Sequence, residues 1–175
     1  MPSQSSLLLP TEKTPDLKLK LVGGGEFDLS AANPGSFTML VFYRGLHCPI
    51  CKGYLNDLDS KLKEFEDVGV TALAISCDPQ DRAEKSKADW GIDPLPIAYD
   101  FEAIEGRKWG LYVSTAIAEK ETPMFVEPGV FLIRPDQTLY AASIQTMPFA
   151  RPHFDEILGA AKFVTKNSYP ARGTA

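Results

Sequence analysis

The chain has 175 residues, of which 44% are hydrophobic and 23% are charged, and its net charge is −5. This composition predicts one globular domain over residues 1–175, and the acidic balance argues against nucleic acid or an anionic membrane as a partner. An odd count of three cysteines argues against a disulfide-stapled secreted protein.

The N-terminal stretch lacks the pattern of a signal peptide, because no basic residue precedes Leu7-Leu8-Leu9. No run of the chain approaches the roughly 18 apolar residues of a membrane span. We therefore expect a cytoplasmic protein without a membrane partner, and we assign residues 1–14 and 167–175 as tails of the domain.

Apolar periodicity predicts strands and helices from the N-terminus onward. Leucines that alternate with lysines before a Gly-Gly-Gly turn, and Phe27 and Leu29 after it, predict a β-hairpin over residues 17–29. The continuous apolar run Thr38–Tyr43 predicts a central strand. From Pro49 to about Asp67, apolar residues at helical spacing predict an amphipathic helix whose buried stripe begins at Cys51.

The remaining segments continue the alternation of strands and helices. We expect strands at Val70–Cys77, Pro96–Tyr99, Val130–Arg134 and Leu139–Ile144, and helices at Gln80–Trp90, Phe101–Leu111, Ser114–Thr122 and Arg151–Lys166. Such alternation implies parallel strands joined by crossover helices, and a short turn makes the last two strands an antiparallel hairpin. The prediction is an α/β domain with a mixed central sheet, helices on both faces and an N-terminal hairpin.

Cys48 and Cys51 lie where the central strand gives way to the first long helix. Gly45 breaks the strand and Pro49 begins the helix, so Cys48 stands at the helix N-terminus, where free N–H groups and the helix dipole stabilise negative charge. A thiol in this position ionises readily, and the thiolate is the reactive form. Cys51 lies one turn further on, so a disulfide between the two needs little backbone movement. We predict a redox-active pair rather than two structural thiols.

This strand-to-helix C-x-x-C resembles the active site of the thioredoxin fold, and the whole chain resembles the AhpC/TSA peroxiredoxin-like (redoxin) family. The likeness is carried by four pieces: the hairpin at 17–29, the stretch Val41–Cys51 (similar to "FYRG-x-x-CP-x-C"), Ala72–Asp78, and Pro128–Asp136 (similar to "P-x-x-FLIDPDG"). The resemblance implies a thiol-dependent antioxidant oxidoreductase without a cofactor. It would reduce hydroperoxides through nucleophilic Cys48, with Cys51 as the resolving cysteine. It also implies a thiol reductant such as thioredoxin, glutaredoxin or glutathione, and homodimers are common in the family.

The chain departs from the family pattern in three places. Peroxiredoxins carry Pro seven residues and Thr or Ser three residues before the nucleophile, where this chain has Val41 and Gly45. Glu127-Pro128 occupies the place of their peroxide-orienting arginine. Pro128 fits instead the proline, commonly cis, that faces the disulfide in thioredoxin-like proteins. Thioredoxin's buried carboxylate, however, is replaced here by Phe42. The resemblance alone does not choose between peroxide and protein disulfide as substrate.

Several neighbours are candidates for a supporting role. Arg44 would lower the pKa of Cys48 and bind a developing negative oxygen, or it is a solvated loop charge. His47 would tune the thiolate or transfer a proton, or it is a surface residue. We interpret Cys77 as a core residue. Arg151 is either part of the site or a charge at a helix start.

Three functional hypotheses follow. The first is a peroxiredoxin-like peroxidase, the second a thioredoxin-like dithiol–disulfide oxidoreductase acting on protein disulfides, and the third a non-catalytic redox sensor or binding module. We expect no metal site, because zinc needs about four ligands and the chain has no second C-x-x-C.

Overall fold

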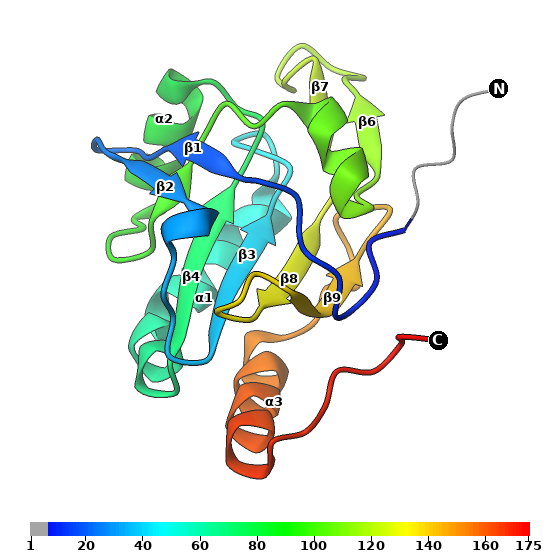
Figure 1. The fold of residues 1–175 in the computed structure, drawn as a ribbon. Helices are drawn as coiled ribbons and strands as arrows, with labels where there is room; N and C mark the ends of the chain where they lie inside the picture. Colours follow the sequence, from blue (N-terminus) through cyan, green and yellow to red (C-terminus); the bar gives the residue numbers. More distant parts are fainter. Residues whose placement is uncertain (1–6) are drawn as a thin grey trace, which may run out of the picture.

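The centre of the fold is a five-stranded mixed sheet in the order β5-β4-β3-β8-β9 (Figure 1). The computed structural model describes residues 7–175, so predictions for residues 1–6 lie outside it. The strands are β3 (Phe37–Phe42), β4 (Val70–Ile75), β5 (Ile97–Ala98), β8 (Gly129–Ile133) and β9 (Leu139–Ile144). β3 pairs in parallel with β4 and antiparallel with β8. The mixed sheet and the central place of the first long strand are confirmed.

Helices cover both faces of this sheet. The helices α1 (Pro49–Asp67), α2 (Gln80–Trp90) and α3 (Phe154–Asn167) contribute to one apolar core with alternate residues of β3, such as Met39. The opposite face packs its core around Phe42 and the 3₁₀ helix η2 (Ala103–Trp109). The thioredoxin-like α/β fold is therefore confirmed, with a 3₁₀ rather than an α-helix on the second face.

The N-terminal part of the chain crosses the second face and reaches both edges of the sheet. Its hairpin consists of β1 (Lys18–Lys20) and β2 (Glu26–Asp28), as the sequence predicts. Leu21 forms a bridge to the edge strand β5, and Lys13 forms one to Thr138 beside the other edge strand, β9. Part of the segment assigned as a tail is thus tied into the sheet by backbone hydrogen bonds.

The predicted helix at Ser114–Thr122 is wrong. The segment instead forms a two-stranded antiparallel hairpin of β6 (Val113–Thr115) and β7 (Met124–Val126), separate from the central sheet. Buried Phe125 lies in β7 and pairs with Ser114 in β6. An antiparallel pair of strands turns such alternate residues toward the core. The burial gained in this way stabilises the hairpin more than the helical spacing of the loop residues stabilises a helix.

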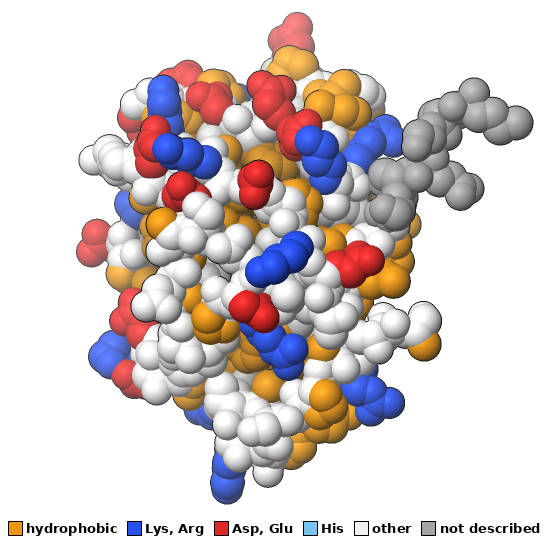
Figure 2. Space-filling view, viewed as in Figure 1, with side chains coloured by type: hydrophobic (Ala, Val, Ile, Leu, Met, Phe, Trp, Pro, Cys, Tyr) orange, Lys and Arg blue, Asp and Glu red, His pale blue; other side chains and the backbone are white. Residues whose placement is uncertain are grey.

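Charged side chains of both signs are mixed on the surface. On the face drawn in Figure 2, Lys and Arg are interspersed with Asp and Glu rather than gathered into a basic patch. Within residues 7–175, no helix combines the length and the apolar character needed to span a membrane.

Candidate active site

Local backbone geometry fixes Cys48 at the start of α1. β3 ends at Phe42, and Gly45 then adopts a φ of +132°, which side chains disfavour. The Cys48 N–H donates to the Gly45 carbonyl at 3.1 Å, and the Cys48 sulfur caps the helix by accepting from the Cys51 N–H at 3.3 Å. Pro49 occupies the first turn, where it has no amide hydrogen to leave unpaired.

Asp78 holds the loop before Cys48, a role that the sequence reasoning missed. Its fully buried carboxylate accepts the Leu46 N–H at 2.7 Å and the Thr122 hydroxyl, and it forms an ion pair with Arg82 at 3.3 Å. A Cβ on Gly45 would lie 2.7 Å from an Asp78 oxygen. The available signal was an acid directly after a buried strand, Ala72–Cys77, at the end of the sheet where the two cysteines also lie.

The two thiols are buried but differ sharply in acidity. Cys48 is 1% exposed and Cys51 is fully buried. The pKa of Cys48 is lowered to about 6, first because the Cys51 thiol donates to its thiolate, and further because of the Cys51 N–H and the guanidiniums of Arg151 and Arg44. Burial, followed by the charge and hydrogen bond of Cys48, raises the pKa of Cys51 well above its usual value. One nucleophilic thiolate and one protonated partner follow from this arrangement.

Arg151 connects both sulfurs to the start of α3. Its Nη2 lies 3.0 Å from the Cys51 Sγ and 3.8 Å from the Cys48 Sγ. Its Nε donates to the Pro148 carbonyl at 2.8 Å, and its guanidinium lies over the Tyr54 ring, 5.0 Å from the ring centroid. Of the two interpretations left open by the sequence, the structure supports the site residue. No pattern in the sequence indicates that its chain segment folds back onto α1.

Arg44 is held on the other side of the site by residues of the β6–β7 hairpin and of the turn that follows it. Its Nε forms an ion pair with the Glu127 carboxylate at 3.0 Å, and its guanidinium lies 5.0 Å from the centroid of the Phe125 ring. Ser114 donates to the second Glu127 oxygen at 2.8 Å. Arg44 is thus a half-buried, anchored charge rather than a solvated one.

His47 packs against the same aromatic ring. Its imidazole lies 4.9 Å from the centroid of Phe125, and neither ring nitrogen has a hydrogen-bond partner among the described residues. Burial, and secondarily the charge of Arg44, lowers the pKa of His47, so the ring is neutral at pH 7. This geometry gives no contact through which His47 would act on Cys48.

Two further sequence predictions meet the structure here. No cis peptide bond occurs in residues 7–175, so the expectation that Pro128 is a cis-proline is wrong; trans is the lower-energy form of a prolyl bond unless packing opposes it. Cys77 packs against the second core, and burial raises its pKa to about 12. It is an inert thiol in a separate cavity lined by Phe101 and Met124.

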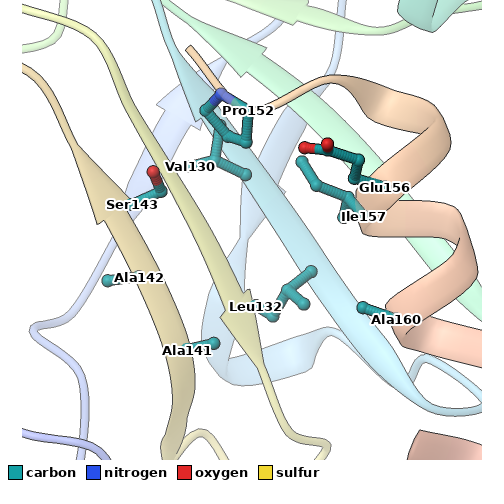
Figure 3. Close-up of a pocket in the computed structure, with 9 residues that line it drawn as sticks. All are labelled: Val130, Leu132, Ala141, Ala142, Ser143, Pro152, Glu156, Ile157 and Ala160. Atoms are coloured by element: carbon teal, nitrogen blue, oxygen red, sulfur yellow. The ribbon is translucent and has the colours of Figure 1, made fainter. Parts of the chain in front are cut away.

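A groove of about 510 Å³ leads to Arg151 from the surface. It is lined mainly by apolar and aromatic side chains, including Ile50, Tyr54 and Phe149, and Arg151 is shared between the groove and the two sulfurs. A second cavity, of about 230 Å³, lies between α3 and the strands β8 and β9 (Figure 3). Its lining is apolar except for Ser143 and Glu156, and it contains no thiol, so it offers no redox chemistry.

Several solved structures share the fold of this chain. Peroxidoxin BcpB from Mycobacterium tuberculosis is 21% identical, with a TM-score of 0.72, over 90% of this chain and 98% of that protein. Peroxiredoxin Q from Xanthomonas campestris is 24% identical, with a TM-score of 0.69, over 92% of this chain and 98% of that protein. AhpC from Enterococcus faecalis is 16% identical, with a TM-score of 0.72, over 95% of this chain and 99% of that protein.

At such identities these structures establish the fold, and no curated protein matches the sequence significantly. The model of the AhpC/TSA family matches residues 10–142, a stretch that includes both members of the Cys48–Cys51 pair. This chain therefore belongs to the AhpC/TSA family of thiol oxidoreductases.

Proposed function

We propose that the protein reduces hydroperoxides through Cys48, with Cys51 as the resolving cysteine. The observation that carries the proposal is the division of acidity within the pair: at neutral pH Cys48 is a thiolate, while Cys51 stays protonated beside it. A peroxidase needs this order, because the nucleophile must be ionised before the peroxide arrives and the resolving thiol must remain available afterwards.

The first step consumes the peroxide. The Cys48 thiolate attacks the terminal oxygen of ROOH, the O–O bond breaks, and the sulfur becomes a sulfenic acid while RO⁻ takes up a proton and leaves as ROH. Arg151 is suited to assist, because its Nη1 is buried and has no hydrogen-bond partner among the described residues. That spare donor would bind the peroxide oxygen on which negative charge develops.

The second step closes the disulfide. The Cys51 sulfur attacks the Cys48 sulfur, a sulfur–sulfur bond forms, and the sulfenic oxygen leaves as water with a proton from the Cys51 thiol. Arg151, 3.0 Å from the Cys51 sulfur, would favour the thiolate that performs this attack. An external thiol reductant then returns the pair to the dithiol. Thioredoxin, glutaredoxin and glutathione are the candidates.

The burial of both sulfurs favours a small oxidant over a protein disulfide. With Cys48 1% exposed, a disulfide held in a protein surface would have to displace the surrounding loops, whereas a peroxide would enter by the groove beside Arg151. The trans bond before Pro128 also removes one of the features that favoured a thioredoxin-like exchanger.

The test is a pair of assays with dithiothreitol as the electron donor: consumption of hydroperoxide and reduction of insulin disulfides. We expect the wild type to consume hydroperoxide and not to reduce insulin, Cys48→Ser to be inactive, and Cys51→Ser to form sulfenic acid without closing a disulfide. Insulin reduction without peroxide turnover would replace the proposal by the disulfide oxidoreductase. A reversible Cys48–Cys51 disulfide with neither activity would replace it by the redox sensor.

A further inference from the structure

The pairing of two strands aligns Glu127 with Arg44. β3 and β8 are antiparallel, and Phe42 lies opposite Gly129 at the end of the ladder. Counting two residues beyond this pair on each chain brings Arg44 opposite Glu127, and their side chains form an ion pair of 3.0 Å between Nε and Oε2. Directly opposed side chains of antiparallel strands are close neighbours, so the register itself produces this pair.

The Glu127 carboxylate is deeply buried, and its Oε2 pairs with Arg44 by charge, without a hydrogen-bond partner among the described residues. Its side chain is 5% exposed, against 18% for Arg44. Its other oxygen accepts from the Ser114 hydroxyl at 2.8 Å, and its own N–H donates to the Tyr112 carbonyl at 2.8 Å. Burying an ion pair costs desolvation energy and often adds nothing to stability compared with apolar residues. Stability alone therefore does not account for a carboxylate at this place.

The anchoring restrains the orientation of the guanidinium. The Glu127 carboxylate lies 3.0 Å from its Nε as a charge pair, and the Phe125 ring covers one face at 5.0 Å from the centroid. A planar guanidinium attracted at one edge and packed on one face is restrained in its orientation. Arg44 precedes the turn in which Cys48 donates to the Gly45 carbonyl, and a hydrogen bond from its side chain is among the causes that lower the pKa of Cys48.

We infer that Glu127 is a positioning residue whose buried carboxylate holds the Arg44 guanidinium toward the reacting sulfur of Cys48. The inference rests on the proposed function only in taking Cys48 as the nucleophile. Three side chains act on the acidity of this thiol: Cys51 on α1, Arg151 before α3, and Arg44 in the loop after β3. Glu127 would act through the last of them.

Positioning and simple charge compensation predict opposite signs. If Glu127 served only as a counter-charge, its removal would leave more uncompensated positive charge near Cys48 and would lower the pKa of that thiol. If Glu127 positions Arg44, its loss lets the guanidinium turn toward solvent, and the pKa of Cys48 rises. The sign of the shift therefore separates the two roles.

The experiment measures the rate of iodoacetamide alkylation at Cys48 against pH, by peptide mass spectrometry of the fully reduced protein. We expect Glu127→Ala and Arg44→Ala each to raise the apparent pKa of Cys48 by about one unit, which leaves about five-fold less thiolate at pH 6. In the double variant with both Glu127→Ala and Arg44→Ala, the pKa of Cys48 should rise by no more than the larger of the two single-variant rises. Glu127→Gln, which keeps an oxygen for Arg44, should stay close to the wild type.

A fall or no change in the pKa of Cys48 in Glu127→Ala overturns the inference, as do additive shifts in the double variant. If Glu127→Ala does not fold, Ser114→Ala decides alone. Ser114→Ala removes only the hydroxyl that binds the second carboxylate oxygen of Glu127. A rise in the pKa of Cys48 in this variant supports positioning, and a fall or no change in that pKa overturns it. Because alkylation does not involve peroxide, failure of the peroxidase assay with this pattern intact would refute the proposed function and not the positioning.

Discussion

Replacing Arg151 by methionine tests the electrostatic basis of the site most directly. Methionine keeps much of the length of the side chain and packs well on an aromatic ring, so contact with Tyr54 is largely preserved while the charge is lost. The positive charge lies 3.8 Å from the Cys48 sulfur, a separation at which unit charges interact by about 1 kcal/mol in water and about 4 kcal/mol near a protein surface.

These energies set the size of the expected change. One pKa unit corresponds to about 1.4 kcal/mol, and the Cys51 thiol and N–H lower the pKa of Cys48 more than Arg151 does, so the loss of Arg151 should raise this pKa by about one unit. From a starting value of about 6, it would reach about 7, and the thiolate fraction at pH 7 would fall from about nine tenths to about one half. Alkylation and peroxide reduction should slow in proportion at pH 7, and alkylation should recover at high pH.

The assay is the pH profile of alkylation at Cys48, followed by hydroperoxide consumption at pH 7. Arg134→Met is the matched control, because Arg134 also lies over a tyrosine ring, at 4.8 Å from the centroid of Tyr140, but has no contact with the sulfurs. We expect the control to behave as the wild type. An unchanged pKa of Cys48 in Arg151→Met would show that the charge of Arg151 does not contribute to the acidity of the thiol.

Two further predictions concern stability. The pKa of Cys48 is lowered from 9.0 to about 6 in the folded state, so ionisation of this thiol stabilises the fold. The stabilisation is complete above pH 9 and is lost as the pH falls through 6, and it amounts to at most about 4 kcal/mol. In urea denaturation of the reduced protein, the advantage of wild type over Cys48→Ser should grow from pH 6 to pH 9; a flat difference would contradict the depressed pKa. Gly45→Ala should lower the free energy of unfolding by about 2–4 kcal/mol, since it adds a Cβ at a φ of +132° and 2.7 Å from a carboxylate oxygen. Gly53→Ala, in open space on α1, should raise it by about 0.5–1 kcal/mol, and equal effects of the two variants would refute the strain at Gly45.

Local chemistry made the core of the site predictable. A glycine, a proline and two cysteines at a strand-to-helix junction are enough to place Cys48 at the helix N-terminus, because each residue acts within one turn of its neighbours. The long apolar run at Thr38–Tyr43 likewise identified the strand that lies at the centre of the sheet.

The residues that the sequence could not assign reach the site across the fold. Arg151 lies 103 residues from Cys48, Glu127 meets Arg44 only through the register of β3 and β8, and Asp78 meets the loop through the end of β4. No local sequence pattern indicates contacts between residues so far apart in the chain. The wrong helix at Ser114–Thr122 has the same origin, since β6 and β7 are stabilised by each other rather than by their own propensities.

The path of the N-terminal segment has a consequence for how the protein reaches its final state. Lys13 and Leu21 close opposite edges of the sheet by bridging Thr138 and Ala98. Both partners are synthesised long after the segment itself, so these contacts have a high sequence separation and form late. Until then both sheet edges are open to strands of other chains. We expect the nascent or partly folded chain, rather than the native protein, to be the species that aggregates, and deletion of residues 1–22 to prolong that stage.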